Sequence, residues 1–137
     1  MIREKSCGAV IFFRRDGRPL YLVEYMRGGH VSLCKGHVEG QETEHETAVR
    51  EIREETALSV RFHDSFRRRI EYSPYPDCMK EVIFFLAECE TTETEAQECE
   101  VSAIRFLPYE EAAAAMTYES DRETLRLAHA FFEEHLV

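Results

Sequence analysis

The sequence GHVEGQETEHETAVREIREETAL occupies residues 36–58. Within it, Thr43 and Glu46 have the S/T-x-x-E spacing of a capping box, in which each side chain accepts a hydrogen bond from the other residue's backbone N–H. We therefore predict a helix over Glu44–Thr56 that begins directly after Thr43, the first residue of this box. The narrow apolar side of the helix, which would face the core, consists of Ala48, Val49 and Ile52.

The same helix carries three carboxylates on one face. Glu51, Glu54 and Glu55 are spaced i, i+3 and i+4, so their side chains are neighbours on the helix surface. Like-charge pairs at this spacing cost roughly 0.2–0.5 kcal/mol each in an isolated helix, and Arg50 cannot neutralise all three carboxylates. One interpretation is a solvated acidic surface. The other is a site for Mg²⁺ or Mn²⁺, hard cations that carboxylates share with substrate phosphates.

The spacing of these residues resembles the Nudix box, written G-x5-E-x7-R-E-U-x-E-E-x-G-U with U aliphatic. The matching positions are Gly36, Glu42, Arg50, Glu51, Ile52, Glu54, Glu55 and Leu58. Ala57 stands where the family has a glycine that ends the helix in left-handed backbone, a conformation that costs alanine about 1–2 kcal/mol. The resemblance implies a metal-dependent hydrolase of nucleoside diphosphates linked to another group. It also implies an α+β fold, an α/β/α sandwich around a mixed β-sheet.

The resemblance assigns roles to residues of the box. Glu51, Glu54 and Glu55 would be ligands of Mg²⁺ or Mn²⁺, and one of them would act as general base. Arg50 would hold a catalytic glutamate by charge-assisted hydrogen bonds. Gly36 would turn the loop before the helix and offer its backbone carbonyl to the metal.

Short segments outside the box resemble the asymmetric diadenosine tetraphosphate hydrolases of this family, beginning with KGHVE at residues 35–39. By this resemblance the substrate-binding residues are His30, Lys35, His37, Lys80, Tyr72 and Tyr118, the two tyrosines forming an adenine clamp. Glu100 would be a distal metal ligand or base, with Glu98 as the competing candidate for that role. The chain departs from the pattern at Ser32-Leu33-Cys34, which replaces a proline-rich stretch, and at Phe106, which replaces a tryptophan.

Alternatives remain open for these residues and for the chain. Tyr72 and Tyr118 are also explained as strand and loop aromatics, His30 and His37 as loop histidines, and Lys80 as an exposed lysine. The same chemistry would suit a nucleoside triphosphate pyrophosphatase or an RNA 5′-pyrophosphohydrolase, although the acidic charge balance disfavours RNA. A catalytically inactive nucleotide sensor is a third possibility, against which the complete set of glutamates argues.

Composition limits the partners and the compartment. The chain has 137 residues and a formal net charge of −10, which would repel DNA, so we expect a small nucleotide substrate and no DNA. No apolar run is long enough for a membrane-spanning helix, and the first residues lack a signal peptide. Five cysteines without a CxxC pair argue against a zinc site or a disulfide framework and favour the cytoplasm. A monomer and a homodimer both remain open.

The hydrophobic pattern predicts a single domain over residues 1–137, with strands before and after the acidic helix. We predict strands at residues 6–13, 20–26, 65–72, 82–89 and 101–107, a polar connection at 91–98 and a short helix at 109–116. Ser120 and Glu123 have the spacing of a second capping box, which predicts a C-terminal helix. The inward face of that helix would be Leu125, Ala128, Phe131 and Phe132.

Overall fold

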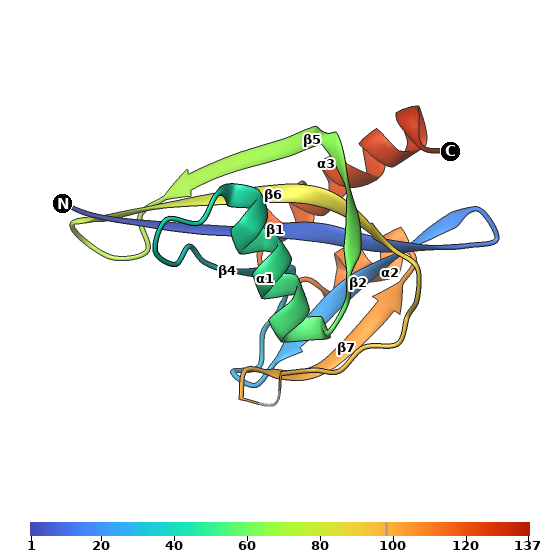
Figure 1. Ribbon diagram of the computed structural model, residues 1–137, viewed down its shortest axis with the longest axis horizontal. Coiled ribbons are helices and arrows are strands. Elements are labelled where there is room, and N and C mark those ends of the chain that lie inside the picture. The colour runs from blue at the N-terminus through green and yellow to red at the C-terminus, as the bar shows by residue number, and fades with distance from the viewer. Residues whose placement is uncertain (98) are drawn as a thin grey trace.

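The computed structural model describes residues 1–97 and 99–137. Figure 1 shows a long central strand with helices on either side of it. In chain order the elements are β1 (Ile2–Arg15), β2 (Arg18–Met26), β3 (Val31–Ser32), β4 (Cys34–His37), α1 (Glu44–Thr56), β5 (Val60–Tyr72), β6 (Cys78–Cys89), β7 (Val101–Leu107), α2 (Tyr109–Ala115) and α3 (Glu119–His135).

Within the described ranges the strands form one mixed sheet of seven strands. Its main order is β3-β2-β1-β6-β5, while β4 pairs with β1 and β7 pairs with β2. β1 and β6 run parallel, with Ile2 opposite Cys78 and Phe12 opposite Glu88. The other pairs are antiparallel. β1 therefore lies in the middle of the sheet and pairs with three different strands.

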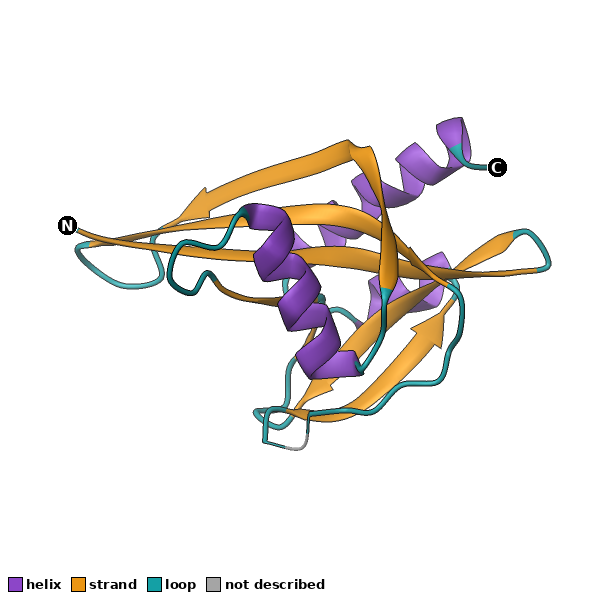
Figure 2. Ribbon diagram, viewed as in Figure 1, coloured by secondary structure: helices purple, strands orange, loops and turns teal. Residues whose placement is uncertain are grey.

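The helices cover both faces of this sheet. Figure 2 shows α1 lying across one face and α2 and α3 against the other. Successive side chains of a strand point to opposite faces, so β1 contributes to both cores. Ile11 packs in the cluster that contains Ile52 of α1, whereas Phe12 packs in the cluster that contains Phe132 of α3. The α/β/α sandwich and the α+β class expected from the resemblance are confirmed.

Helix α1 begins and ends at the predicted residues. Thr43 Oγ1 accepts from the Glu46 N–H at 3.1 Å, and Glu46 Oε1 accepts from the Thr43 N–H at 2.8 Å, so the capping box is complete. Ala48 and Ile52 are buried as predicted. The prediction for Val49 is wrong, because this side chain is 37% exposed. It lies about 100° around the helix from Ala48, beyond the edge of the buried side.

Ala57 ends α1 in the left-handed conformation, with φ 65° and ψ 14°. Its N–H donates to the Arg53 carbonyl at 2.9 Å, so the helix closes as a glycine would close it. The alanine therefore keeps the turn of the family pattern and bears the strain expected of a Cβ atom at that φ.

The other differences concern elements whose sequence signals are weak. β3 and β4 are short strands that the sequence pattern did not predict. β5 begins at Val60 and not at Ser65, because residues 60–62 also pair with β6, before a register shift between Phe62 and Arg67. The second capping box is wrong: α3 begins at Glu119 after Tyr118, without a side-chain cap. Asp121 of the supposed box is instead a buried residue of the helix.

Candidate active site

One cavity of about 560 Å³ opens where β2, β4, α1 and the start of β6 meet. The predicted site residues that line it are His30, Lys35, Gly36, His37, Glu51, Glu55, Lys80 and Glu100. Its other lining residues include Glu24, Ser32 and Cys99. The cavity thus brings carboxylates together with lysine and histidine side chains.

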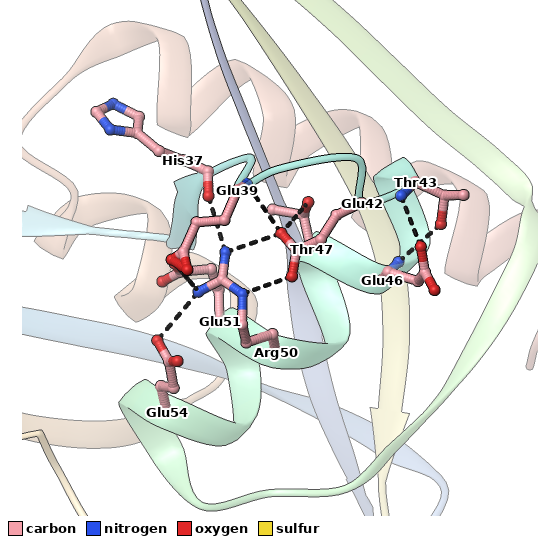
Figure 3. Close-up of polar contacts among 9 residues, drawn as sticks. All are labelled: His37, Glu39, Glu42, Thr43, Glu46, Thr47, Arg50, Glu51 and Glu54. Carbon is pink, nitrogen blue, oxygen red and sulfur yellow. Dashed lines mark hydrogen bonds and ion pairs between the residues drawn. The ribbon is translucent and has the colours of Figure 1, made fainter.

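Arg50 is the centre of a hydrogen-bonded network beside this cavity (Figure 3). Its guanidinium donates to both carboxylate oxygens of Glu42, at 2.7 and 3.1 Å, and to the carbonyl oxygen of His37 at 2.8 Å. Nη1 also donates to Glu51 at 2.8 Å and to Glu54 at 3.2 Å. The bonds from Arg50 are the main reason that the pKa of Glu42 is lowered to about 2. Arg50 therefore fixes two of the three predicted metal-binding carboxylates of α1 against the loop that precedes this helix.

Glu54 differs in position from its two partners in the box. It does not line the cavity; with Arg50 and Arg53 it borders a shallow groove on the outer side of α1. Figure 3 shows its carboxylate turned toward the guanidinium of Arg50. Glu54 and Glu51 thus share one hydrogen-bond donor, Nη1 of Arg50.

Gly36 is explained by close packing rather than by a turn. It lies in β4, opposite Cys7 of β1, so the expected loop-turning role is wrong. A Cβ atom at this position would lie 1.9 Å from the carboxyl carbon of Glu51. Only glycine lets the Glu51 carboxylate approach the backbone of β4 so closely.

Glu55 is buried, at 3% exposure, against a second buried glutamate that the sequence pattern did not select, Glu24 of β2. Among the residues that the structure describes, Oε1 of Glu55 and Oε2 of Glu24 have no hydrogen-bond partner. Burial raises the pKa of both carboxyls, and in Glu55 the charge of Glu24 raises it further. Buried carboxylate oxygens without hydrogen-bond partners can act as ligands of a hard divalent cation, so Glu55 fits Mg²⁺ or Mn²⁺. The one sequence signal for Glu24 is a charge inside the apolar run at residues 20–26.

Two nitrogen-bearing side chains of the cavity, those of Lys80 and His37, lie close to one another. Lys80 Nζ is 3.5 Å from Nε2 of His37. Burial is the main cause of the lowered pKa of Lys80, and the charge of Lys35 adds to it. Such a group gains most from an anionic partner, because a phosphate oxygen would offset both the lost solvation and the repulsion.

The two tyrosines of the expected clamp lie outside the cavity lining and outside the core. Tyr72 ends β5 at 43% exposure, and Tyr118 precedes α3 at 55% exposure. Burial is the main cause of the raised pKa of Tyr72, and Tyr118 is among the nearby groups that contribute to it. The ring of Tyr118 has its centroid 5.9 Å from that of His30, a cavity residue. Tyr118 thus lies beside one cavity residue, and Tyr72 pairs in the sheet with another, Lys80.

Glu100 lies just before β7 and lines the cavity. Its carbonyl oxygen accepts from the Arg27 N–H at 2.9 Å, which ties the start of β7 to the loop after β2. The preceding connection is bonded to the end of α1, since Gln97 N–H donates to the carbonyl of Glu55 at 3.3 Å. Glu98, the competing candidate, lies outside the described residues.

The chain is similar to known proteins over most of its length. The family description NUDIX domain matches residues 3–128. The asymmetrical bis(5′-nucleosyl)-tetraphosphatase of Mus musculus is 32% identical over 139 residues, covering 93% of this chain and 94% of that protein. The tetraphosphatase of the same name from Sus scrofa is 30% identical with the same coverage.

Solved structures share the fold. A binary complex of a C. elegans Ap4A hydrolase superposes with a TM-score of 0.86 at 23% identity, covering 96% of this chain and 98% of the other. The E. coli dihydroneopterin triphosphate pyrophosphohydrolase superposes with a TM-score of 0.73 at 19% identity, covering 93% and 97% of the two chains.

In residues 1–97 and 99–137 no helix combines the length and apolar character needed to cross a membrane. The cysteines are free thiols, four of them buried and Cys99 exposed. Because the NUDIX domain matches most of its length and its curated relatives are at least 30% identical, this chain belongs to the Nudix family and is a pyrophosphohydrolase similar to the asymmetrical tetraphosphatases.

Proposed function

We propose that residues 1–137 form a hydrolase domain that cleaves dinucleoside polyphosphates, with diadenosine tetraphosphate split into ATP and AMP. The observation that carries this proposal is the cavity that joins Glu51 and Glu55 to Lys35, His37 and Lys80. Carboxylates that bind a metal and cations that bind phosphate are both needed for hydrolysis of a polyphosphate chain. The names of the curated relatives support the choice of substrate.

The proposed metal ligands are the carboxylates of Glu51, Glu54, Glu55 and Glu100 and the carbonyl of Gly36, with Mg²⁺ or Mn²⁺ as the cofactor. When bound, such an ion offsets charge on the phosphoryl oxygens and lowers the pKa of a water molecule. The unpartnered oxygen of Glu55 supports this assignment, and so does the close approach of Glu51 to Gly36.

The remaining groups position the reactants. Arg50 holds Glu51 and Glu54 in place. One of these glutamates, or Glu100, takes the proton of the attacking water. Lys35, His30, His37 and Lys80 bind the phosphates that are not attacked. Tyr72 and Tyr118 stack on an adenine base, which contributes roughly 1–3 kcal/mol per base.

The test is a product assay with Mg²⁺ over a panel of diadenosine tetraphosphate, nucleoside triphosphates and 5′-triphosphorylated RNA. We expect ATP and AMP as the products of diadenosine tetraphosphate, at a higher kcat/KM than for the other substrates. Hydrolysis in ¹⁸O-labelled water shows which phosphorus is attacked. Preferential turnover of nucleoside triphosphates or RNA would contradict the proposed substrate, and turnover that is unchanged after metal removal would contradict the mechanism.

The surroundings of the protein are part of the same proposal. Free thiols and a net charge of −10 support a cytoplasmic enzyme that acts on small nucleotides and does not bind DNA. Light scattering of the purified chain distinguishes the monomer from the homodimer.

A further inference from the structure

Three buried side chains from three separate elements converge beneath the cavity. They are Glu24 of β2, Cys34 of β4 and Glu55 of α1, with exposures of 1%, 1% and 3%. One ligand atom of each, the sulfur of Cys34 and a carboxylate oxygen of each glutamate, lies within 4.8 Å of the other two. Ligands of a tetrahedral site are about 3.5 Å apart when the bonds to the metal measure ~2.0–2.3 Å. The three side chains are thus spaced closely enough to bind one ion.

One carboxylate oxygen of each glutamate lacks the hydrogen-bond partner that a buried polar atom normally has. Oε2 of Glu24 and Oε1 of Glu55 accept no hydrogen bond from any group in residues 1–97 and 99–137. An unsatisfied buried acceptor is destabilising, and more so when it is charged. Two such oxygens beside one thiol are explained by a cation that binds to all three side chains.

Sulfur determines which cation fits best. Mg²⁺ and Mn²⁺ prefer oxygen ligands, whereas a thiolate favours Zn²⁺, Co²⁺ and related transition-metal ions. Three protein ligands would leave one position of a tetrahedral ion for water. Glu24 and Glu55 line the cavity and Cys34 does not, so the cavity supplies both the entry path and that water.

We propose that Glu24, Cys34 and Glu55 form a binding site for one transition-metal dication of the Zn²⁺ type, with the Cys34 thiolate as a direct ligand. The thiol releases its proton to the solvent when the sulfur binds the ion. This proposal goes beyond the proposed hydrolysis, since Glu24 and Cys34 have no part in it. The two sites share Glu55.

The first experiment is a titration of the metal-free chain with Co²⁺, followed by absorption spectroscopy. We expect sulfur-to-cobalt charge-transfer absorption that saturates at one equivalent in the wild type and is absent in Cys34→Ser. Cys99→Ser is the matched control, because Cys99 also lines the cavity but is exposed and outside the cluster. Its spectrum should equal that of the wild type.

Three results would overturn the proposal. These are no charge-transfer absorption in the wild type, absorption that persists in Cys34→Ser, and absorption that disappears in Cys99→Ser. If Cys34→Ser does not fold, the wild-type spectrum together with that of Cys99→Ser decides the question. A wild type without the absorption would mean that the two carboxylates satisfy each other by sharing a proton.

The second experiment separates this site from the proposed active site. In equilibrium dialysis we expect Cys34→Ser and Glu24→Gln each to weaken Zn²⁺ binding by at least about tenfold. Unchanged Zn²⁺ affinity in both variants would overturn the assignment. Mg²⁺-dependent hydrolysis should be retained in Cys34→Ser. A wild type that binds Co²⁺ through sulfur but hydrolyses no nucleotide would contradict the proposed function and leave this site standing.

Discussion

Gly36 and the carboxylate of Glu51 are in such close contact that a Cβ atom on residue 36 would lie 1.9 Å from the carboxyl carbon. The first prediction follows from this contact. In Gly36→Ala the methyl group displaces Glu51 from the cavity, and we expect kcat to fall by about 100-fold or more because small displacements of reacting groups are costly.

Steady-state hydrolysis and circular dichroism check this prediction. Gly28→Ala is the control, since a Cβ atom there would meet His30 at an ordinary 3.6 Å. Near-wild-type turnover of Gly36→Ala, with the fold retained, would show that the position of Glu51 does not matter for the reaction.

A substitution of Glu54 tests whether this glutamate of the Nudix box takes part in the reaction. Its carboxylate lies outside the cavity and 3.2 Å from Arg50, yet the family pattern places it among the metal ligands and candidate bases. We expect Glu54→Gln to lower kcat by about 100-fold, within the range for loss of a general acid–base group. Glu111→Gln, an exposed change on α2, serves as the control. Turnover of Glu54→Gln within a few-fold of wild type would remove Glu54 from the proposed set.

The tyrosine clamp predicts a change in KM rather than in kcat. Loss of stacking in Tyr72→Ala combined with Tyr118→Ala should raise KM for diadenosine tetraphosphate by about 10–100-fold, since stacking contributes roughly 1–3 kcal/mol per base. Tyr75→Ala removes a tyrosine that is similarly exposed, at 46%, and bonded to Glu4. This control should leave KM unchanged. A double variant with the wild-type KM would refute the clamp.

We expect the stability of the protein to depend on pH through Glu44, at the start of α1. It accepts two hydrogen bonds from Arg67 and one from Lys5, and the bonds from Arg67 are the main reason that its pKa is lowered from 4.5 to about 2. A carboxyl whose pKa is lower in the folded state stabilises the protein above its unfolded pKa. That contribution is lost as the pH falls from about 4.5 through 2.

We therefore expect Glu44→Gln to lower the free energy of unfolding at pH 7 by roughly 1 kcal/mol, a value reduced by the partial exposure of the ion pairs. Urea unfolding at several pH values measures this, and the difference from wild type should narrow below pH 4.5. A constant difference down to pH 2 would show that the ion pairs are not its cause.

We expect that replacing Ala57 by glycine stabilises the folded protein. Glycine relieves the strain of a Cβ atom at φ 65° but adds freedom to the unfolded chain, so Ala57→Gly should gain roughly 0.5–1 kcal/mol. Ala114→Gly, on the exposed side of α2, should instead lose roughly 0.5–1 kcal/mol. Thermal unfolding of the two variants should therefore shift in opposite directions. A lower melting temperature for Ala57→Gly would show that the turn is not strained.

Local signals explain which elements could be predicted. The bounds of α1 could be read from Thr43, Glu46 and the residues that follow, because capping bonds and helix periodicity involve neighbours in the chain. β3 and β4 could not, since strands of two and four residues depend on partners in β2 and β1. Ser120 and Glu123 have the spacing of a capping box, but the helix starts before them because packing of Asp121 and Leu125 fixes its position.

The sequence alone determined the carboxylate-bearing helix, the family and the reaction class, since each depends on residue types at fixed short spacings. Only the tertiary structure placed Glu24 and Cys34 against Glu55, and only it turned Glu54 away from the cavity. Burial and contacts between distant segments arise when strands and helices pack together, and no spacing along the chain encodes them. The lack of a CxxC pair therefore argued only against zinc sites built from residues that are neighbours in the sequence. A site assembled from three separate elements leaves no such pattern.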